Sequence, residues 1–187
     1  MITFEKHNRP LMIVDCRFDY EYRGGHIKGA LNLSDPQQMK EYFLKDRQTI
    51  ERLMGTVIIF HCEFSQKRGP EMYSTLREID RRLHMNVYPQ LFFSEIYILE
   101  GGYKQFFENH PDLCEGGYVP MADKSYKEDC RDKFSKHKRD YQEFKANRSN
   151  FEIPNIISID AKAEQAHAKS PSRFQIEEDE FFEDDEH

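Results

Sequence analysis

Hydrophobic and polar positions divide the chain into short apolar runs separated by segments with helical spacing. The apolar runs contain many β-branched residues and cover residues 11–16, 30–33, 57–60 and 97–99. Continuous apolar runs of this kind are typical of strands in a parallel sheet that is covered on both faces. Helical patterns lie between them, over residues 19–24, 36–44, 70–83 and 103–109. Alternating strands and helices predict an α/β domain with a central parallel sheet flanked by helices.

The C-terminal third of the chain has a different pattern. Between residues 123 and 149, aromatic, histidine and cysteine side chains recur at helical spacing: Tyr126, Cys130, Phe134, His137, Tyr141 and Phe144. This spacing predicts an amphipathic helix that packs on the domain, with its charged side either solvated or used for docking. From residue 150 the periodicity is lost, and we expect 150–187 to be a disordered tail. The predicted division of the chain is therefore 1–122, 123–149 and 150–187.

The charge balance shows that the acidity belongs to this tail. The chain has 27 Lys and Arg against 34 Asp and Glu, a formal net charge of −7, and eight of the acids lie in residues 177–187. The rest is nearly neutral, which argues against a basic nucleic-acid-binding protein. No run approaches the roughly 18 apolar residues of a membrane span. We expect a soluble, intracellular, monomeric protein with neither nucleic acid nor a membrane as partner.

The cysteines point to chemistry rather than to a disulfide framework or a metal site. Cys16, Cys62, Cys114 and Cys130 are widely scattered, without a Cys-x-x-Cys pair or histidines at zinc-binding spacing. We therefore expect free thiols and no metal. The open question is whether one of them is reactive.

One stretch places a cysteine and an arginine at the two ends of a strand-to-helix loop. Cys62 follows the apolar run 57–60, and Gly69-Pro70 opens the next helix, where proline is favoured in the first turn. Such a loop directs backbone N–H groups inward and, with the helix N-terminus, binds anions. The expected phosphate-binding loop comprises Glu63, Phe64, Ser65, Gln66, Lys67 and Arg68.

The two end residues of this loop suit phosphoryl transfer. Donors and positive charge around Cys62 stabilise its thiolate, which can attack phosphorus and form a phosphocysteine. Arg68 offers a planar fork to two phosphoryl oxygens, which lysine cannot imitate. The alternative is that Cys62 simply ends a strand and Arg68 is a surface charge.

The stretch 61–70, together with Met72, resembles the active-site stretch of the M-phase inducer phosphatases, dual-specificity phosphatases that activate cyclin-dependent kinases. Similar blocks flank it at residues 15–33 and 88–107, and Cys114, Tyr118, Pro120 and Met121 fit the stretch that follows. The resemblance covers about residues 10–135 in the correct order. It implies a rhodanese-like domain without a cofactor. It also implies a phosphorylated cyclin-dependent kinase with its cyclin as partner, a role in entry into mitosis, and location in the nucleus and cytoplasm.

The resemblance also implies residue roles. It makes Cys62 the nucleophile, Arg68 the phosphate clamp and Cys16 the thiol that traps oxidised Cys62 as a reversible disulfide. Three further residues match positions that dock the kinase: Arg77, Arg81 and Tyr88. The alternatives are a buried strand-end cysteine for Cys16 and solvated charges for the two arginines. We expect Asp15 to be a buried partner of the loop rather than a catalyst.

The loop departs from the family at Gln66 and Lys67, where the usual second carboxylate is missing. Glu63 is then the carboxylate left inside the loop and the leading internal candidate for the general acid, while the substrate is another source of the proton. Glu71 and about two extra residues before Tyr88 also depart from the pattern, which affects docking more than chemistry.

Other functions on the same scaffold are an arsenate reductase, a sulfurtransferase and a non-catalytic kinase-binding module. A sulfur-carrying loop is usually one residue shorter, because it need not surround a tetrahedral oxyanion, so the span from Cys62 to Arg68 favours phosphate or arsenate. The intact Cys62 and Arg68 argue against a non-catalytic module. In the predicted tail, the sequence 170–173 is either a plain turn or a site for a proline-directed kinase.

Overall fold

The main sheet has parallel strands at its centre, as the apolar runs predict. The computed structural model describes residues 2–4, 9–85 and 89–146. The strands of this sheet are β1 (Ile2–Phe4), β2 (Arg9–Asp15), β4 (Leu31–Asn32), β5 (Val57–His61) and β6 (Ile96–Ile98). β2 pairs in parallel with both β4 and β5, and β5 pairs in parallel with β6, while β1 runs antiparallel along the start of β2. The predicted parallel sheet is confirmed.

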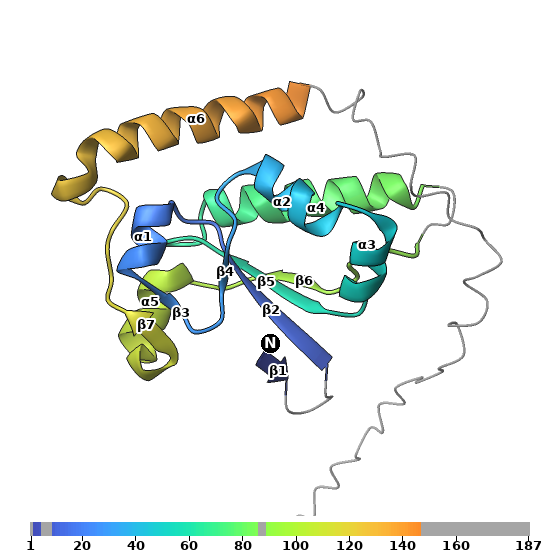
Figure 1. The fold of residues 1–187 in the computed structure, drawn as a ribbon, viewed down its shortest axis with the longest axis horizontal. Coiled ribbons are helices and arrows are strands. Elements are labelled where there is room, and N and C mark those ends of the chain that lie inside the picture. Colours follow the sequence, from blue (N-terminus) through green and yellow to red (C-terminus); the bar gives the residue numbers. More distant parts are fainter. Residues whose placement is uncertain (1, 5–8, 86–88, 147–187) are drawn as a thin grey trace, which may run out of the picture. The chain divides into compact units, whose positions relative to one another are not determined.

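Helices lie on both faces of this sheet (Figure 1). The α-helices are α1 (Asp19–Gly24), α2 (Pro36–Phe43), α3 (Arg47–Leu53), α4 (Arg68–Leu83), α5 (Gly102–Asn109) and α6 (Lys127–Ala146). The 3₁₀ turns η1 (Pro111–Leu113) and η2 (Lys124–Tyr126) precede β7 and α6, and β3 (Gly25–Ile27) pairs antiparallel with β7 (Cys114–Gly116). Two hydrophobic clusters result, one beneath α2, α3 and α4 and a smaller one around α5, β3 and β7.

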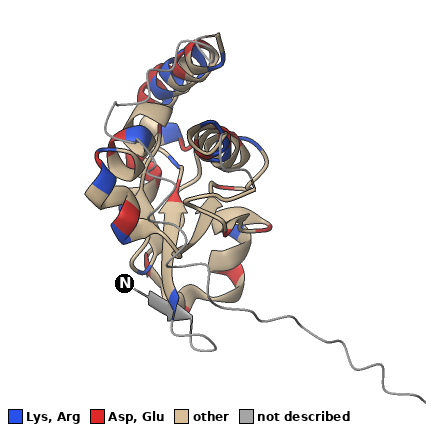
Figure 2. Cartoon of the chain, turned by 90° about the vertical axis from the view of Figure 1, so that its right-hand side faces the viewer, with Lys and Arg blue, Asp and Glu red and all other residues tan. Residues whose placement is uncertain are grey.

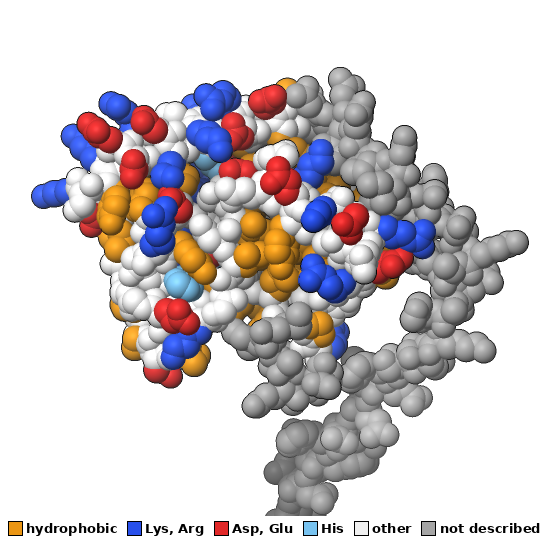
Figure 3. Space-filling model, in the orientation of Figure 1, with side chains coloured by type: hydrophobic (Ala, Val, Ile, Leu, Met, Phe, Trp, Pro, Cys, Tyr) orange, Lys and Arg blue, Asp and Glu red, His pale blue; other side chains and the backbone are white. Residues whose placement is uncertain are grey.

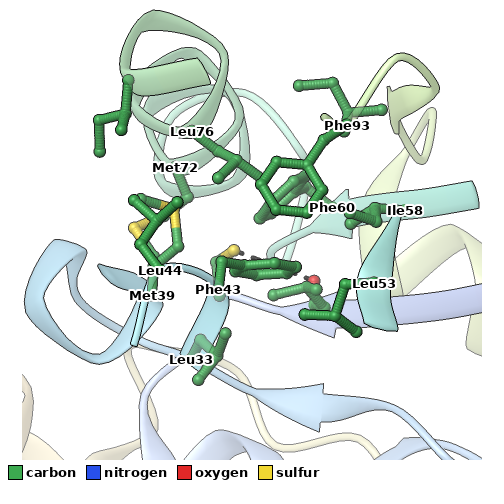
Figure 4. Close-up of a cluster of buried hydrophobic side chains, with 14 of the residues drawn as sticks. Leu33, Met39, Phe43, Leu44, Leu53, Ile58, Phe60, Met72, Leu76 and Phe93 are labelled. Carbon is green, nitrogen blue, oxygen red and sulfur yellow. Dashed lines mark hydrogen bonds between the residues drawn. The ribbon is translucent and has the colours of Figure 1, made fainter. Parts of the chain in front are cut away.

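The larger cluster is built from side chains that the apolar pattern marks as buried (Figure 4). Ile58 and Phe60 of β5 are fully buried and alternate with the half-buried Ile59, so one face of β5 points into this cluster. Phe43 from α2 meets Phe93 in an edge-to-face contact with ring centroids 5.5 Å apart. Each aromatic side chain of this size buries a large apolar area, which adds to that of the aliphatic residues in the cluster.

Local signals account for the starts of α2 and α3. Asp35 and Asp46 cap α2 and α3 by accepting hydrogen bonds from the N–H groups of Gln38 at 2.9 Å and Thr49 at 2.7 Å. The helix predicted from residue 70 begins two residues earlier, at Arg68. Four elements were not expected, namely β1, β3, β7 and α3. They are short, and β1, β3 and β7 depend on pairing with partners elsewhere, which periodicity alone does not reveal.

α6 occupies the predicted amphipathic segment. His137 is its one buried residue, and Phe144 packs against the larger hydrophobic cluster. Its other side carries exposed charges of both signs, which are interspersed in Figures 2 and 3. The mixture is typical of a solvated face. No helix in the described part of the chain is both long and apolar enough to cross a membrane. The predicted tail, 150–187, and Tyr88 lie outside the described residues.

Candidate active site

Cys62 lies where the central strands of the sheet end. It follows His61, the last residue of β5, and its side chain is buried. The N–H of Cys16 donates to the carbonyl of His61 at 2.7 Å, so the chains leaving β2 and β5 stay side by side beyond the sheet. The carboxyl ends of parallel strands are where α/β domains place their reactive groups. Topology therefore brings two cysteines from distant parts of the sequence to one edge of the sheet.

The loop after Cys62 is held from outside by the start of α5. The N–H groups of Tyr103 and Lys104 donate to the carbonyls of Cys62 and Glu63 at 2.9 and 3.0 Å. Gly102 has a positive φ of 63°, and a Cβ there would lie 2.6 Å from both of those carbonyl oxygens. Only glycine allows the backbone of α5 to approach this closely.

The remaining loop residues keep unused donors. Among the described residues, none accepts a hydrogen bond from the backbone N–H groups between Phe64 and Lys67. The Oγ of Ser65 is also buried without a partner in that part of the chain, and its backbone is left-handed with φ 54°. Buried polar groups are normally paired, so the Ser65 hydroxyl is the notable case, and together with the loop N–H groups it fits an anion that accepts several hydrogen bonds.

Arg68 stands at the far end of the loop, as the first residue of α4, and is 4% exposed. Its Nη1 and Nη2 donate to the two oxygens of Glu21 at 2.5 and 3.0 Å, and its guanidinium carbon lies 4.7 Å from the ring centroid of Phe18. Burial alone lowers the pKa of Arg68, but the hydrogen bonds and charge of Glu21 outweigh burial and raise that pKa above its ordinary value. The guanidinium is therefore permanently charged.

Glu63 faces the segment that precedes α6. Its Oε1 accepts from the hydroxyl of Tyr118 at 2.5 Å, and its Oε2 accepts from the N–H of Met121 at 3.3 Å. Burial, with the hydrogen bond and charge of Glu63, raises the pKa of Tyr118, so the phenol remains the donor. Through these two contacts Glu63 anchors the segment 118–121 to the loop. Its role as general acid stays a prediction.

A second group of buried charges lies beneath the loop. Asp15 accepts from Nε and Nη2 of Arg17, at 3.0 to 3.1 Å and 2.7 Å, and Arg17 lies 3.8 Å above the ring centroid of Tyr103. Burial alone raises the pKa of Asp15, but His61 and Arg17 together lower it below its ordinary value. Burial lowers the pKa of His61, whose Nε2 is 3.8 Å from Asp15. Asp15 is thus buried and binds Arg17, and its direct partnership with the loop stays a prediction.

Cys16 is fully buried beside this group and is a free thiol, as is Cys62. Burial, followed by the negative charge of a Cys62 thiolate, raises the pKa of Cys16 well above its ordinary value. Cys16 is thus a protonated neighbour of Cys62. Its trapping role stays a prediction.

The predicted docking residues lie apart from the loop. Arg77 donates to the carbonyls of Phe93 and Ser94 at 2.7 and 3.1 Å, so its guanidinium binds the segment before β6. Arg81 is exposed on α4. Neither arrangement tests docking, which stays a prediction for both arginines and for Tyr88.

α6 packs next to the loop. His137 lies with Nε2 3.0 Å from Glu71 in the first turn of α4 and Nδ1 3.3 Å from the carbonyl of Ser34. Lys67 in the loop lies 5.1 Å from the ring centroid of Phe134. The helix therefore forms one flank of the site. Among the described residues, no group of three or more His, Cys, Asp or Glu side chains could hold a metal ion.

Glu21, Phe18 and Tyr118 are the site residues that sequence reasoning did not assign. Glu21 and Phe18 lie more than forty residues before Arg68, and Tyr118 lies 55 residues after Glu63. No local sequence pattern predicts contacts between residues so far apart in the chain. Glu21 and Tyr118 lie within family-like stretches, and the resemblance assigns a role to neither of them.

Comparisons with known proteins identify the domain family and similar relatives of the chain. The rhodanese-like domain family matches residues 4–109. The chain is 44% identical over 137 residues to M-phase inducer phosphatase cdc-25.3 of Caenorhabditis elegans, covering 68% of this chain and 42% of that protein. It is 49% identical over 121 residues to M-phase inducer phosphatase 1-B of Xenopus laevis, covering 64% and 22%. It is 47% identical over 117 residues to human M-phase inducer phosphatase 3, covering 62% and 24%.

Among solved structures, Ygr203w, a yeast protein tyrosine phosphatase of the rhodanese family, matches with a TM-score of 0.46 and 24% identity, over 63% of this chain and 83% of that chain. The chain spans less than half the length of each of the three M-phase inducer phosphatases. It belongs to the rhodanese-like domain family, and its similarity to M-phase inducer phosphatases confirms the resemblance that the motifs indicate.

Proposed function

We propose that the chain is a cysteine-dependent dual-specificity protein phosphatase. Its substrate is the phosphotyrosine and phosphothreonine of a cyclin-dependent kinase bound to its cyclin, and its reaction promotes entry into mitosis. The observation that carries the proposal is the loop from Cys62 to Arg68, with a thiol at one end, a buried guanidinium at the other and unpaired donors between them. The names of the similar proteins support the same activity.

The reaction runs in two displacements. The Cys62 thiolate attacks phosphorus, a P–S bond forms, and the P–O bond to the tyrosine or threonine oxygen breaks as that oxygen takes up a proton. Water then attacks the phosphocysteine, which releases inorganic phosphate and restores the thiolate. Arg68 and the loop N–H groups bind the equatorial oxygens, where charge gathers in the transition state.

The segment around the loop suits a protein substrate rather than a small molecule. Phe64 is exposed, and Lys67 and Lys104 lie over the rings of Phe134 and Phe64 and form no ion pair with acids in the described part of the chain. Cations and an aromatic side chain at the rim are complementary to a phosphorylated segment of another protein. From the family resemblance, we also propose that the protein acts in the nucleus and cytoplasm, which a fluorescent fusion would test.

The decisive experiment removes the nucleophile. Cys62→Ser is expected to reduce hydrolysis of para-nitrophenyl phosphate and of a doubly phosphorylated kinase by at least about 10³-fold, because an unactivated hydroxyl cannot replace the thiolate. The matched control is Cys130→Ser, a thiol in α6 that should retain activity. If Cys62→Ser folds and remains active, the proposed mechanism is wrong. Arsenate reduction and thiocyanate formation, assayed in parallel, separate phosphatase activity from the alternatives on this scaffold.

A further inference from the structure

The contact between Glu21 and Arg68 joins a helix before β3 to the first residue of α4. Glu21 is 0% exposed, and each of its oxygens accepts from a different terminal nitrogen of Arg68. We propose that Glu21 is a positioning residue, which fixes the guanidinium so that its free edge faces the bound phosphoryl group. The proposal rests on the proposed function of the loop.

The donor count of the guanidinium permits this double use. Arginine has five N–H donors in a fixed planar fork. Glu21 takes one from Nη1 and one from Nη2, in an end-on arrangement. The Nε–H and an outer N–H of a terminal nitrogen remain on the side edge, and two parallel donors of this kind bind two oxygens of a phosphoryl group. Carboxylate and phosphate therefore use different edges of one side chain.

Glu21 is itself held firmly enough to act as a template. Its Oε2 also accepts from the N–H of Phe18 at 2.9 Å, and the Phe18 ring lies against the face of the guanidinium. Asp19, two residues before Glu21, forms an ion pair with Lys133 of α6, in which Oδ1 and Nζ are 2.5 Å apart. Tyr20 stacks on Tyr126 with ring centroids 4.7 Å apart. η2 and α6 therefore hold α1 in place. Glu21 fixes the end of the Arg68 guanidinium, and Phe18 fixes its face.

Position matters more than charge in this arrangement. A negative charge 2.5 Å from Arg68 weakens the attraction of that arginine for a phosphate dianion, so electrostatics alone would make Glu21 unfavourable for binding. What the carboxylate supplies is orientation of the planar fork, on which bidentate contacts to the transition state depend. Glu21 should therefore affect turnover more than substrate affinity.

The test is a double-mutant cycle with the full chain. Glu21→Gln retains the size of the side chain but gives up one acceptor oxygen, and it is expected to lower kcat for para-nitrophenyl phosphate about 10- to 100-fold with little change in KM. In an Arg68→Lys background, the same change is expected to alter kcat by less than about twofold, because the fork that Glu21 orients is gone. A loss in that background equal to the loss in wild type would show that Glu21 acts by its charge or through stability, and would overturn the proposal. So would an unchanged kcat in Glu21→Gln.

Asp80→Asn supplies the matched control. Asp80 is also 0% exposed and accepts two backbone hydrogen bonds, from Phe92 and Phe93 at 2.9 and 3.0 Å, but it lies outside the loop. The Asp80→Asn substitution should lower thermal stability without lowering kcat. Vanadate binding, followed by thermal shift, keeps the test independent of turnover, because vanadate becomes five-coordinate on a thiolate and mimics the transition state: Glu21→Gln should lose stabilisation by vanadate even if the wild type proves not to hydrolyse phosphate esters. Inactive wild type refutes the proposed function, whereas equal vanadate stabilisation of wild type and Glu21→Gln refutes the positioning role.

Discussion

The two ends of the central strand β5 are surrounded by opposite chemistry. Ile58 and Phe60 point into an apolar cluster completed by α2, α3 and α4, whereas the next residues, His61 and Cys62, meet buried charges. The burial of apolar area and close packing stabilise the apolar cluster, and both depend little on the identity of any one neighbouring side chain. The charged group is stable only as a set, because each buried ion needs its partner. We infer that the first region mainly sets stability and the second mainly sets geometry at the loop.

The largest expected effect separates the two regions by removing an apolar side chain. Phe43→Ala is expected to lower the free energy of unfolding by about 4 kcal/mol, since Phe43 is fully buried against Phe93 and Phe60. Turnover per folded molecule should not change. Urea denaturation measures the first quantity and active-site titration with turnover the second. Tyr97→Ala, an aromatic residue that is 50% exposed, is the control and should cost far less stability. Equal costs in the two variants would contradict the distinction.

Substitution in the charged region is expected to cost less stability than Phe43→Ala but to lower activity as well. Asp15→Asn keeps an acceptor for Arg17 and removes the charge that balances it, for an expected cost of about 2–3 kcal/mol. Because Arg17 packs on Tyr103, whose N–H holds the carbonyl of Cys62, kcat should fall as well. Denaturation and steady-state kinetics on the same sample check both effects. Unchanged kcat would show that the charged group is not coupled to the loop.

The smallest expected effect is on pH dependence. His61 has a lowered pKa, mainly because of burial, so the unfolded chain binds more protons than the folded one below the ordinary histidine value of 6.5. Stability is therefore expected to fall as the pH drops below about 6.5, by at most about 1.4 kcal/mol per pH unit. The lowered pKa of Asp15 acts in the same direction, as the pH falls below its ordinary value of 3.8. Denaturation at pH 7.5 and 5.5 measures the slope, which should be shallower in His61→Asn. The same slope in both proteins would exclude His61 as the cause.

The sequence by itself determined the central parallel strands with most of the helices between them, the rhodanese-like character and the two ends of the loop. The signals are local features: apolar runs such as 57–60, the glycine and proline at 69–70, and the spacing of Cys62 and Arg68. These signals therefore needed no knowledge of distant residues.

Only the tertiary structure decided what surrounds those two residues. It brought Glu21 to Arg68, placed Tyr118 and Met121 on Glu63 and set Asp15 beneath the loop with Arg17. It also showed Arg77 bound to the carbonyls of Phe93 and Ser94. Buried charges and donors choose partners by distance in space rather than along the chain, since the cost of leaving them unpaired falls on whichever groups the fold brings together. A local motif can name the nucleophile and the clamp, but their orientation comes from residues that the motif does not contain.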